Sequence, residues 1–337
     1  LSLLLAALAL AACGNNEEAG EDVSVGGIHP TDIVAKYDGG EVTGKQLIAY
    51  LGARKYFYFD EMYAFYEMLP NYKESMLYEL IANRIITKDA GEDTLKASKE
   101  IAGSMMDSLK SALEENEDFK TTMDSFLSAE GITMQDLEDF IVMSYNLQSV
   151  LENKYTDEEI RAKYEEKLKE DENAFLRATV RHILVRLTDE EGNERTEEEA
   201  LKRAQEAQVK LKNGGDWTTI AKEYSDDPGS NQNGGKYEDY QVSAWVDEFK
   251  QHAIEQPIGE VGEPFLTAYG YHVMVVEDRR QPDFEEVKDQ VRSEMIDEYY
   301  TNMIEVEVPK LVTEINLPVA EEETTDGTGE GEAEAAE

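Results

Sequence analysis

The sequence contains very little cysteine and little positive charge. A single cysteine in 337 residues excludes an intramolecular disulfide and any metal site built from several cysteines. Only 32 lysine and arginine residues stand against 74 aspartate and glutamate residues, so the formal net charge is −42 at pH 7. Because the phosphates of nucleic acids and the headgroups of anionic lipids repel such a chain, we expect its surface to bind neither.

Several motifs of nucleotide and metal chemistry are also missing. The sequence has no internal repeat, no phosphate-binding loop, no GxGxxG fingerprint and no HExxH zinc motif. We therefore expect no cofactor and no metal ion. Hydrophobic residues make up 41% of the chain and aromatic residues 9%, which suffices for buried cores, and the length suits two domains.

The chain opens with an apolar run, LSLLLAALALAA at residues 1–12, which Cys13 and a polar segment follow. This run is too short to span the roughly 30 Å hydrocarbon core of a bilayer as a helix. It suits the apolar part of an export signal. Because no basic stretch and no methionine precede it, we expect the signal to be truncated at its start.

Residues Leu10-Ala11-Ala12-Cys13 resemble the lipobox of bacterial lipoproteins. The resemblance implies that Cys13 is lipidated and becomes the mature N-terminus, which anchors the protein outside the cytoplasmic membrane. The alternative is a lone cysteine that lies in a cleaved signal by chance. Residues 14–30 are rich in Gly, Asn and Glu and predict a flexible tether.

Residues 31–176 predict a mostly helical module, because apolar residues recur every three or four positions over much of this stretch. The expected elements are a strand at 33–37, a helix from Thr43 to about residue 69, helices within 72–153, and a helix that a capping box at 156–159 opens.

Residues 177–280 predict a compact α+β domain with a small sheet flanked by helices. The expected elements are a strand at 178–187, helices at 197–212 and 217–224, a loop at 225–235, and strands at 263–268 and 271–277. Residues 281–318 predict a helix to about residue 312 that returns to the helical module, and 319–337 predict a disordered acidic tail. The fold class is thus α+β, with a helical module formed by both chain ends and the smaller domain inserted into it.

Two of the four histidines lie inside predicted strands of this domain. His182 follows Arg181 in an apolar stretch, and His272 lies in the last strand. A histidine between apolar residues is costly to bury unless it is hydrogen-bonded, so the two imidazoles are candidates to bond to each other. His29 and His252 are given no site role.

Residues 177–280 resemble a parvulin-type, or PpiC-type, peptidyl-prolyl isomerase domain. The matching stretches are RHILV at 181–185, KNGGDW at 212–217, AKEYSDDPGS at 221–230, the double glycine 234–235, Glu248-Phe249, PIGEV at 257–261 and EPFLTAYGYHVMVVED at 263–278. The resemblance implies an enzyme that turns the peptide bond before proline in a non-covalent pocket.

The resemblance also implies a role for each of seven residues. The implied catalytic residues are His182 and His272 at the floor of the site, Thr267 as their supporting hydroxyl, and Asp227 beside the prolyl bond. The implied proline pocket consists of Tyr237, Trp245 and Phe249. Two of these depart from the family pattern, because Tyr237 stands at a position that is usually leucine and Trp245 at one that is usually methionine.

The helical ends, the inserted domain and the lipobox together resemble the PrsA-type foldase lipoproteins of Gram-positive bacteria. This resemblance implies a lipid-anchored, extracytoplasmic foldase that holds unfolded exported proteins and isomerises their prolyl bonds. Two alternatives stay open: a holding chaperone whose parvulin-shaped domain is inactive, and a solute-binding lipoprotein, which would need two α/β lobes. Dimerisation stays open as well.

Nine aromatic residues lie between Tyr50 and Tyr72. Four consecutive aromatic residues on a helix advance about 100° each and cannot share one face. Packing between elements is the simpler interpretation. The sharper hypothesis is a groove for unfolded clients, made by Tyr56, Phe57, Tyr58, Phe59 and Met62.

Overall fold

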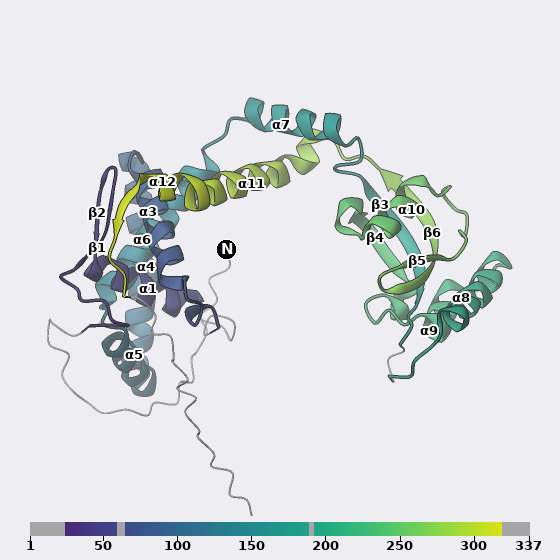
Figure 1. Ribbon diagram of the computed structural model, residues 1–337, viewed down its shortest axis with the longest axis horizontal. Helices are drawn as coiled ribbons and strands as arrows, with labels where there is room; N and C mark the ends of the chain where they lie inside the picture. The colour runs from purple at the N-terminus through teal and green to yellow at the C-terminus, as the bar shows by residue number, and fades with distance from the viewer. Residues whose placement is uncertain (1–23, 59–64, 189–191, 319–337) are drawn as a thin grey trace, which may run out of the picture. The chain divides into compact units, whose positions relative to one another are not determined.

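The computed structural model describes residues 24–58, 65–188 and 192–318 and divides the chain into two compact units (Figure 1). The first unit takes its residues from both chain ends, up to Lys154 and from Ile296 onward. The second unit comprises Tyr155–Met295. The expected α+β class, with a helical part formed by both ends and an inserted domain, is confirmed.

The unit boundaries differ from those that the sequence suggests. Helix α7 (Asp157–Glu170) lies in the second unit, as does most of α11 (Phe284–Asn302), because the two share a small core. That core consists of Ile160, Phe175, Phe284, Val287 and Val291. The capping box of Thr156 that opens α7 is present as predicted.

The first unit contains a three-stranded antiparallel sheet that sequence periodicity largely missed. Its strands are β1 (Ile33–Tyr37), β2 (Gly40–Thr43) and β7 (Val312–Ile315), in the order β2-β1-β7. Only β1 is predicted. The strands β2 and β7 have four residues each, which is too short for an alternating pattern to stand out, and the expected helix continues over the start of β7.

Helices fill the rest of this unit: α1 (Gly44–Tyr58), α3 (Tyr72–Thr87), α4 (Glu92–Glu115), α5 (Glu117–Glu130), α6 (Met134–Glu152), a π-helical turn (Met303–Glu307) and α12 (Val308–Leu311). Their shared core includes Leu47, Leu77, Ile81, Met106 and Leu137, all fully buried. Ile28 is also in this core and Val25 packs against it, so the end of the segment predicted as a tether contacts the first unit, whereas residues 14–23 lie outside the described residues. A solute-binding lipoprotein would need two α/β lobes. The described residues of the first unit do not form such a lobe, which disfavours the solute-binding alternative.

Part of the aromatic cluster packs against this core. Phe57 stacks on Phe140 with ring centroids 5.6 Å apart, and Tyr56 lies 5.7 Å from Phe126. These two rings therefore fit the simpler interpretation, which is packing between elements, and do not line an open groove. Tyr58 is 41% exposed, whereas Phe59 and Met62 lie outside the described residues.

The second unit is built on a four-stranded antiparallel sheet in the order β4-β3-β6-β5. The strands are β3 (Arg177–Val185), β4 (Lys236–Gln241), β5 (Phe265–Thr267) and β6 (Gly270–Arg280). The sequence predicts β3, β5 and β6 but not β4, whose ladder with β3 is interrupted by a bulge and by the positive φ of Asp239.

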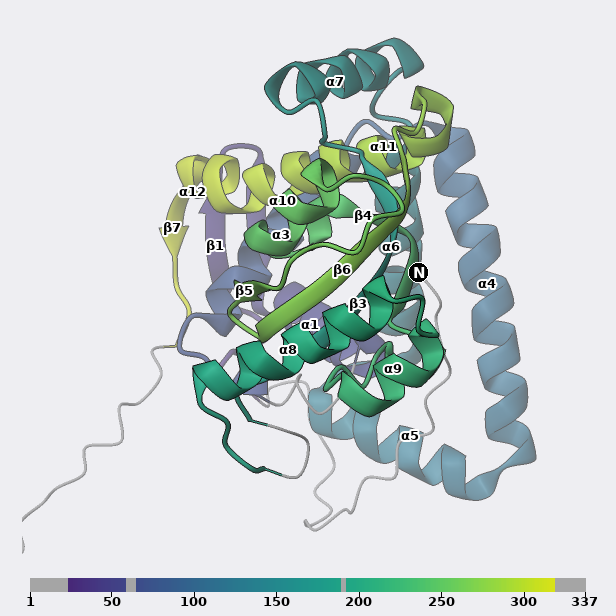
Figure 2. The ribbon, with the colours of Figure 1, turned by 90° about the vertical axis from the view of Figure 1, so that its right-hand side faces the viewer.

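The helices of this unit cover opposite faces of the sheet. Helices α8 (Glu197–Lys212) and α9 (Trp217–Tyr224), both predicted, lie side by side and pack on the face that carries Ile183 and Val273 (Figures 1 and 2). Helix α10 (Asp247–Glu255) packs on the other face, where Val180 and Met274 lie. Even-numbered residues of the central strands therefore face α10.

Gly235 makes an unusually close approach that fixes β4 beside β3. Its φ is +71°, its carbonyl accepts the backbone N–H of His182 at 2.9 Å, and a Cβ built on it would lie 1.9 Å from the carbonyl oxygen of His182. Only glycine tolerates both the left-handed backbone and this contact.

We expect Gly235→Ala to lower the free energy of unfolding of the second unit by about 3 kcal/mol or more, from backbone strain and the clash together. The matched control is Gly214→Ala, because Gly214 has a φ of +83° but open space around it. Gly214→Ala should lower the free energy of unfolding by about 1–2 kcal/mol. Both tryptophans, Trp217 and Trp245, lie in the second unit, so their fluorescence during urea unfolding measures this unit alone. Equal losses for the two variants would contradict the close approach.

Candidate functional site

The register of β3 and β6 brings His182 and His272 together. His182 is opposite Met274 and His272 is opposite Leu184, so the two histidines are diagonal neighbours on one face of the ladder. Each is 4% exposed, and their Nδ1 atoms lie 3.1 Å apart. The structure thus places the two imidazoles in contact beneath α10.

The imidazole pair is hydrogen-bonded at both ends. Thr267 Oγ1, on β5, lies 2.9 Å from Nε2 of His272, and Asp227 Oδ2 lies 3.0 Å from Nε2 of His182. Thr267 Oγ1 accepts the backbone N–H of Tyr269 at 3.1 Å, and its own hydrogen can go to Nε2 of His272 or, at 3.5 Å, to the carbonyl of Gly270.

These partners assign the protons of both rings. The carboxylate of Asp227 only accepts, so the proton of His182 is on Nε2 and is donated to it. Nδ1 of His182 then accepts from the Nδ1–H of His272, which leaves Nε2 of His272 as an acceptor for the hydroxyl of Thr267. Every donor in the row points toward Asp227.

The loop after α9 holds the carboxylate of Asp227 in place. Oδ2 accepts the hydroxyls of Ser230 and, at 3.1 Å, of Tyr237, while Oδ1 accepts the backbone N–H of Gly229 at 3.1 Å. The loop is tied to β3, because the backbone N–H of Asp226 donates to the carbonyl of Leu184 at 2.7 Å.

The charges of the site follow from these contacts. Burial alone raises the pKa of Asp227, but hydrogen bonds from His182 and Ser230 outweigh it and hold this pKa well below the usual range. Burial, followed by the neighbouring His182, lowers the pKa of His272 to about 3. Burial and the charge of Asp227 raise the pKa of Tyr237 to about 12. At neutral pH the site therefore contains an anionic Asp227, a neutral His272 and a neutral Tyr237.

Aromatic rings form a wall beside the imidazoles. The ring of Phe249, on α10, meets those of His182 and His272 edge to face, at centroid distances of 5.3 and 5.2 Å. Trp245 lies 5.0 Å from Phe249, and its ring stacks on Tyr240 at 5.3 Å. All seven site residues implied by the resemblance are thus brought together in the second unit.

This arrangement suits non-covalent chemistry. Both ring nitrogens of each histidine are hydrogen-bonded and both rings are buried, so neither imidazole is available as a nucleophile. What the site offers to a ligand is an apolar aromatic wall next to one fixed carboxylate.

Sequence reasoning missed two contributors to the site. Ser230 is 1% exposed and touches both Asp227 and His182, yet a serine in a Gly/Asn-rich loop carries no signal of burial. Phe265 stacks on His272 at 5.4 Å and on His252 at 3.8 Å, which gives His252 a packing contact with the site. The alternation of side chains along β5 and β6 could have predicted that Phe265 lies on the same face as His272. The contact with His252 could not be predicted, because it depends on where α10 lies. Cys13, the implied lipid attachment residue, lies outside the described residues.

The lowered pKa of His272 predicts an acid-sensitive second unit. An unfolded histidine has a pKa of about 6.5 and takes up a proton between pH 7 and 5, whereas folded His272 does not. The folded state thus binds fewer protons, and its stability falls by about 2 kcal/mol over this range. His272→Gln, measured by tryptophan fluorescence in urea at both pH values, should remove most of this loss, and the exposed His29→Gln should not. The carboxyl of Asp227 contributes to the loss of stability on acidification only below about pH 4. A wild-type stability that does not change with pH would refute a neutral buried His272.

Comparison with known proteins assigns the second unit to a family. Residues 162–280 match the family model of the PPIC-type PPIASE domain. The foldase protein PrsA 3 of Bacillus anthracis is 29% identical over 231 residues, which cover 68% of this chain and 70% of that protein. The foldase protein PrsA of Oceanobacillus iheyensis is 26% identical over 349 residues, which cover 99% of this chain and 97% of that protein.

Among solved structures, the crystal structure of a peptidylprolyl isomerase (PrsA) from Bacillus cereus matches with a TM-score of 0.41 and 20% identity, covering 83% of this chain and 92% of that one. The family match identifies residues 162–280 as a PpiC-type, or parvulin-type, peptidyl-prolyl cis-trans isomerase domain, and a foldase protein named PrsA is similar to this chain along nearly its whole length.

Proposed function

We propose that the second unit binds X-Pro segments of unfolded, exported proteins and accelerates rotation about their prolyl bonds without a covalent intermediate. The observation that carries this proposal is the buried imidazole pair, hydrogen-bonded from Thr267 to Asp227 under Phe249. Tyr237, Trp245 and Phe249 would hold the proline ring. The carboxylate of Asp227 would act on the carbonyl before proline.

The energetics support such a mechanism. Rotation about a peptide bond costs about 18–20 kcal/mol, and the planar imide is more dipolar than the twisted one. An apolar wall removes water from the carbonyl and thereby raises the free energy of the planar form relative to the twisted form. A fixed negative charge beside the carbonyl oxygen acts in the same direction. Because each tenfold in rate requires only about 1.4 kcal/mol, these two effects suffice for useful catalysis.

We further propose that lipid chains on Cys13 anchor the protein at the outer face of the cell membrane. The support is the lipobox-like sequence after an apolar run. Among the described residues, no helix is both long enough and apolar enough to cross a bilayer. A lipid anchor would keep the isomerase domain where exported chains emerge.

Holding of clients would fall to the first unit. Tyr58, Phe65, Tyr66, Met68 and Leu69 are exposed apolar residues at its surface, and Met68 is 82% exposed. Such residues suit transient contact with unfolded chains. Dimerisation stays open, as it does in the sequence analysis.

Isomerisation of an Ala-Phe-Pro-Ala-type peptide, followed by NMR exchange, tests the catalytic proposal on the full chain. We expect the wild type to accelerate exchange and Asp227→Asn, which keeps the shape but removes the charge, to lower kcat/KM about tenfold or more with KM little changed. The matched control is Glu238→Gln, because Glu238 is an exposed acidic residue on β4, and it should leave kcat/KM unchanged.

Two results would count against the proposal. No acceleration by the wild type would leave the holding chaperone with an inactive domain as the better description. If the wild type and Asp227→Asn accelerate exchange equally, the carboxylate has no part in the mechanism, although the domain is still an isomerase.

A further inference from the structure

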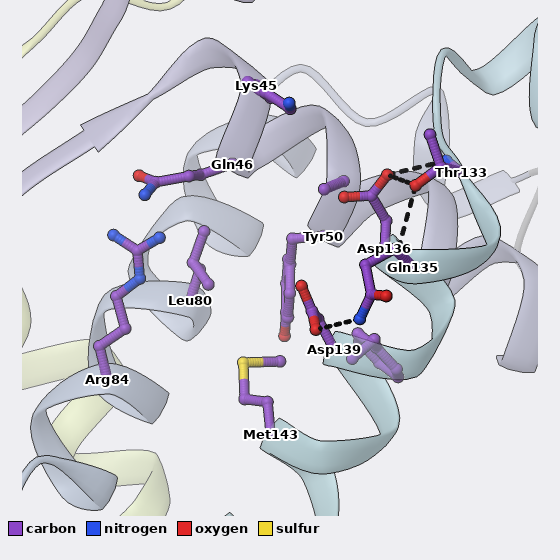
Figure 3. A pocket seen from close by; sticks show the side chains of 12 residues that line it. Lys45, Gln46, Tyr50, Leu80, Arg84, Thr133, Gln135, Asp136, Asp139 and Met143 are labelled. Carbon is purple, nitrogen blue, oxygen red and sulfur yellow. Dashed lines mark hydrogen bonds between the residues drawn. The ribbon is translucent and has the colours of Figure 1, made fainter. Parts of the chain in front are cut away.

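The first unit contains a pocket of about 530 Å³ between α1, α3 and α6 (Figure 3). Its volume is in the range of pockets that bind compact organic ligands. Nothing in the chemistry of the second unit uses this pocket, because every residue that lines it belongs to the first unit.

Apolar side chains form the floor of this pocket. Tyr50, Leu80 and Phe140 are buried. Met143 adds a flexible thioether beside Tyr50 (Figure 3). The ring of Tyr50 is fixed, because its hydroxyl donates to Glu79 at 2.8 Å and its centroid lies 5.7 Å from that of Phe140. The floor therefore offers a preformed apolar surface to a bulky side chain.

Charges of opposite sign line the rim. Lys45 from α1 and Arg84 from α3 are basic, whereas Asp136 and Asp139 at the start of α6 are acidic. Figure 3 shows Arg84 across the pocket from the two aspartates and Lys45 at the α1 end. Among the described residues, no ion pair joins Lys45 or Arg84 to either aspartate. One Nη of Arg84 donates to the carbonyl of Glu41 at 3.2 Å, and Oδ2 of Asp136 accepts the backbone N–H of Thr133 at 2.8 Å, so Lys45 and Asp139 are the rim charges most open to a ligand.

Lys45 is in a place that helix electrostatics disfavours. It lies in the first turn of α1, where the helix dipole is positive and acidic residues are preferred. It is exposed, and no described acidic residue pairs with it, although the chain holds 74 acidic residues. Because Lys45 gains nothing from the helix dipole and lines the pocket, its charge is placed to meet an anionic group of a ligand.

Two glutamines on the rim supply hydrogen-bonding groups for a peptide backbone. Oε1 of Gln46 accepts the N–H of Thr43 at 3.0 Å, which leaves its amide hydrogens free among the described residues. Nε2 of Gln135 donates to Asp139 at 3.0 Å, which leaves its oxygen free among the same residues. The rim thus offers both a donor and an acceptor, as an extended segment of chain requires.

We propose that this pocket binds a short extended segment of unfolded polypeptide in which an aromatic or long aliphatic residue lies between an acidic and a basic residue. The apolar side chain contacts the floor, the acidic group pairs with Lys45 and Arg84, and the basic group pairs with Asp139. The inference rests on the proposed holding of clients and gives that function a defined site in the first unit.

The test uses fluorescent proline-free peptides, which the isomerase site has no reason to select, and measures their anisotropy with the full chain. The probe carries Glu-Leu-Phe-Lys in a Gly/Ser background. One comparison peptide replaces both charges with glutamine, and the other replaces Leu-Phe with Ala-Ala. We expect the probe to bind at least fivefold more tightly than either, with the advantage over the uncharged peptide lost at 1 M salt.

Substitutions then place the binding in the pocket. Ala49→Leu adds bulk inside it on a helix that tolerates leucine, and should weaken binding of the probe about tenfold. The matched control Ala112→Leu, also half-buried but on α4, should change it less than twofold. Lys45→Gln should weaken binding about threefold or more, and Lys88→Gln, another exposed lysine without an ion pair among the described residues, should not.

The outcomes separate this inference from the proposed function. If the wild type suppresses aggregation of an unfolded client but Ala49→Leu binds the probe as the wild type does, the pocket is not the site and the inference is overturned. If the probe fails to bind the wild type at all, the inference is overturned while isomerisation of proline peptides is untouched. If the wild type neither suppresses aggregation nor isomerises, the proposed function fails on its own.

Discussion

The register between β3 and β6 is the constraint on which the site depends. It places His182 and His272 diagonally on the face that α10 covers, and a slip of either strand by one residue would turn one of the two imidazoles to the other face. The same two strands position the partners of the histidines. Thr267 lies on β5, which pairs with β6, and the Asp227 loop is tied to β3 through the carbonyl of Leu184. A backbone ladder thus aligns a row of side-chain hydrogen bonds whose members are far apart in sequence.

The parts of this arrangement that were predictable from sequence are those with a repeating or locally encoded signal. The strands of His182 and His272 are long enough to be recognised, and the capping box of Thr196 correctly opens α8. Other parts have no such signal. The strands β2, β4 and β7 are too short or too irregular for alternation to show, and the burial of Ser230 depends on the conformation of a whole loop.

The two departures from the family pattern acquire different meanings in the structure. Tyr237 does more than replace an apolar side chain, because its hydroxyl adds a further donor to Oδ2 of Asp227 and helps to hold that carboxylate in place. Trp245 makes the wall of the site more aromatic, with one ring neighbour on the surface, Tyr240, and one in the interior, Phe249. Neither contact could be read from sequence, since each depends on the path of β4 and on the placement of α10.

The orientation of the protons in the row from Thr267 to Asp227 is the central claim of this account, because it connects the neutral His272 to the fixed charge of Asp227. Nitrogen-15 NMR of the histidine rings measures it directly in the full chain. The account predicts that at pH 6 His272 is neutral with its proton on Nδ1 and that His182 carries its proton on Nε2. An imidazolium at His272, or a proton on its Nε2, would contradict the account.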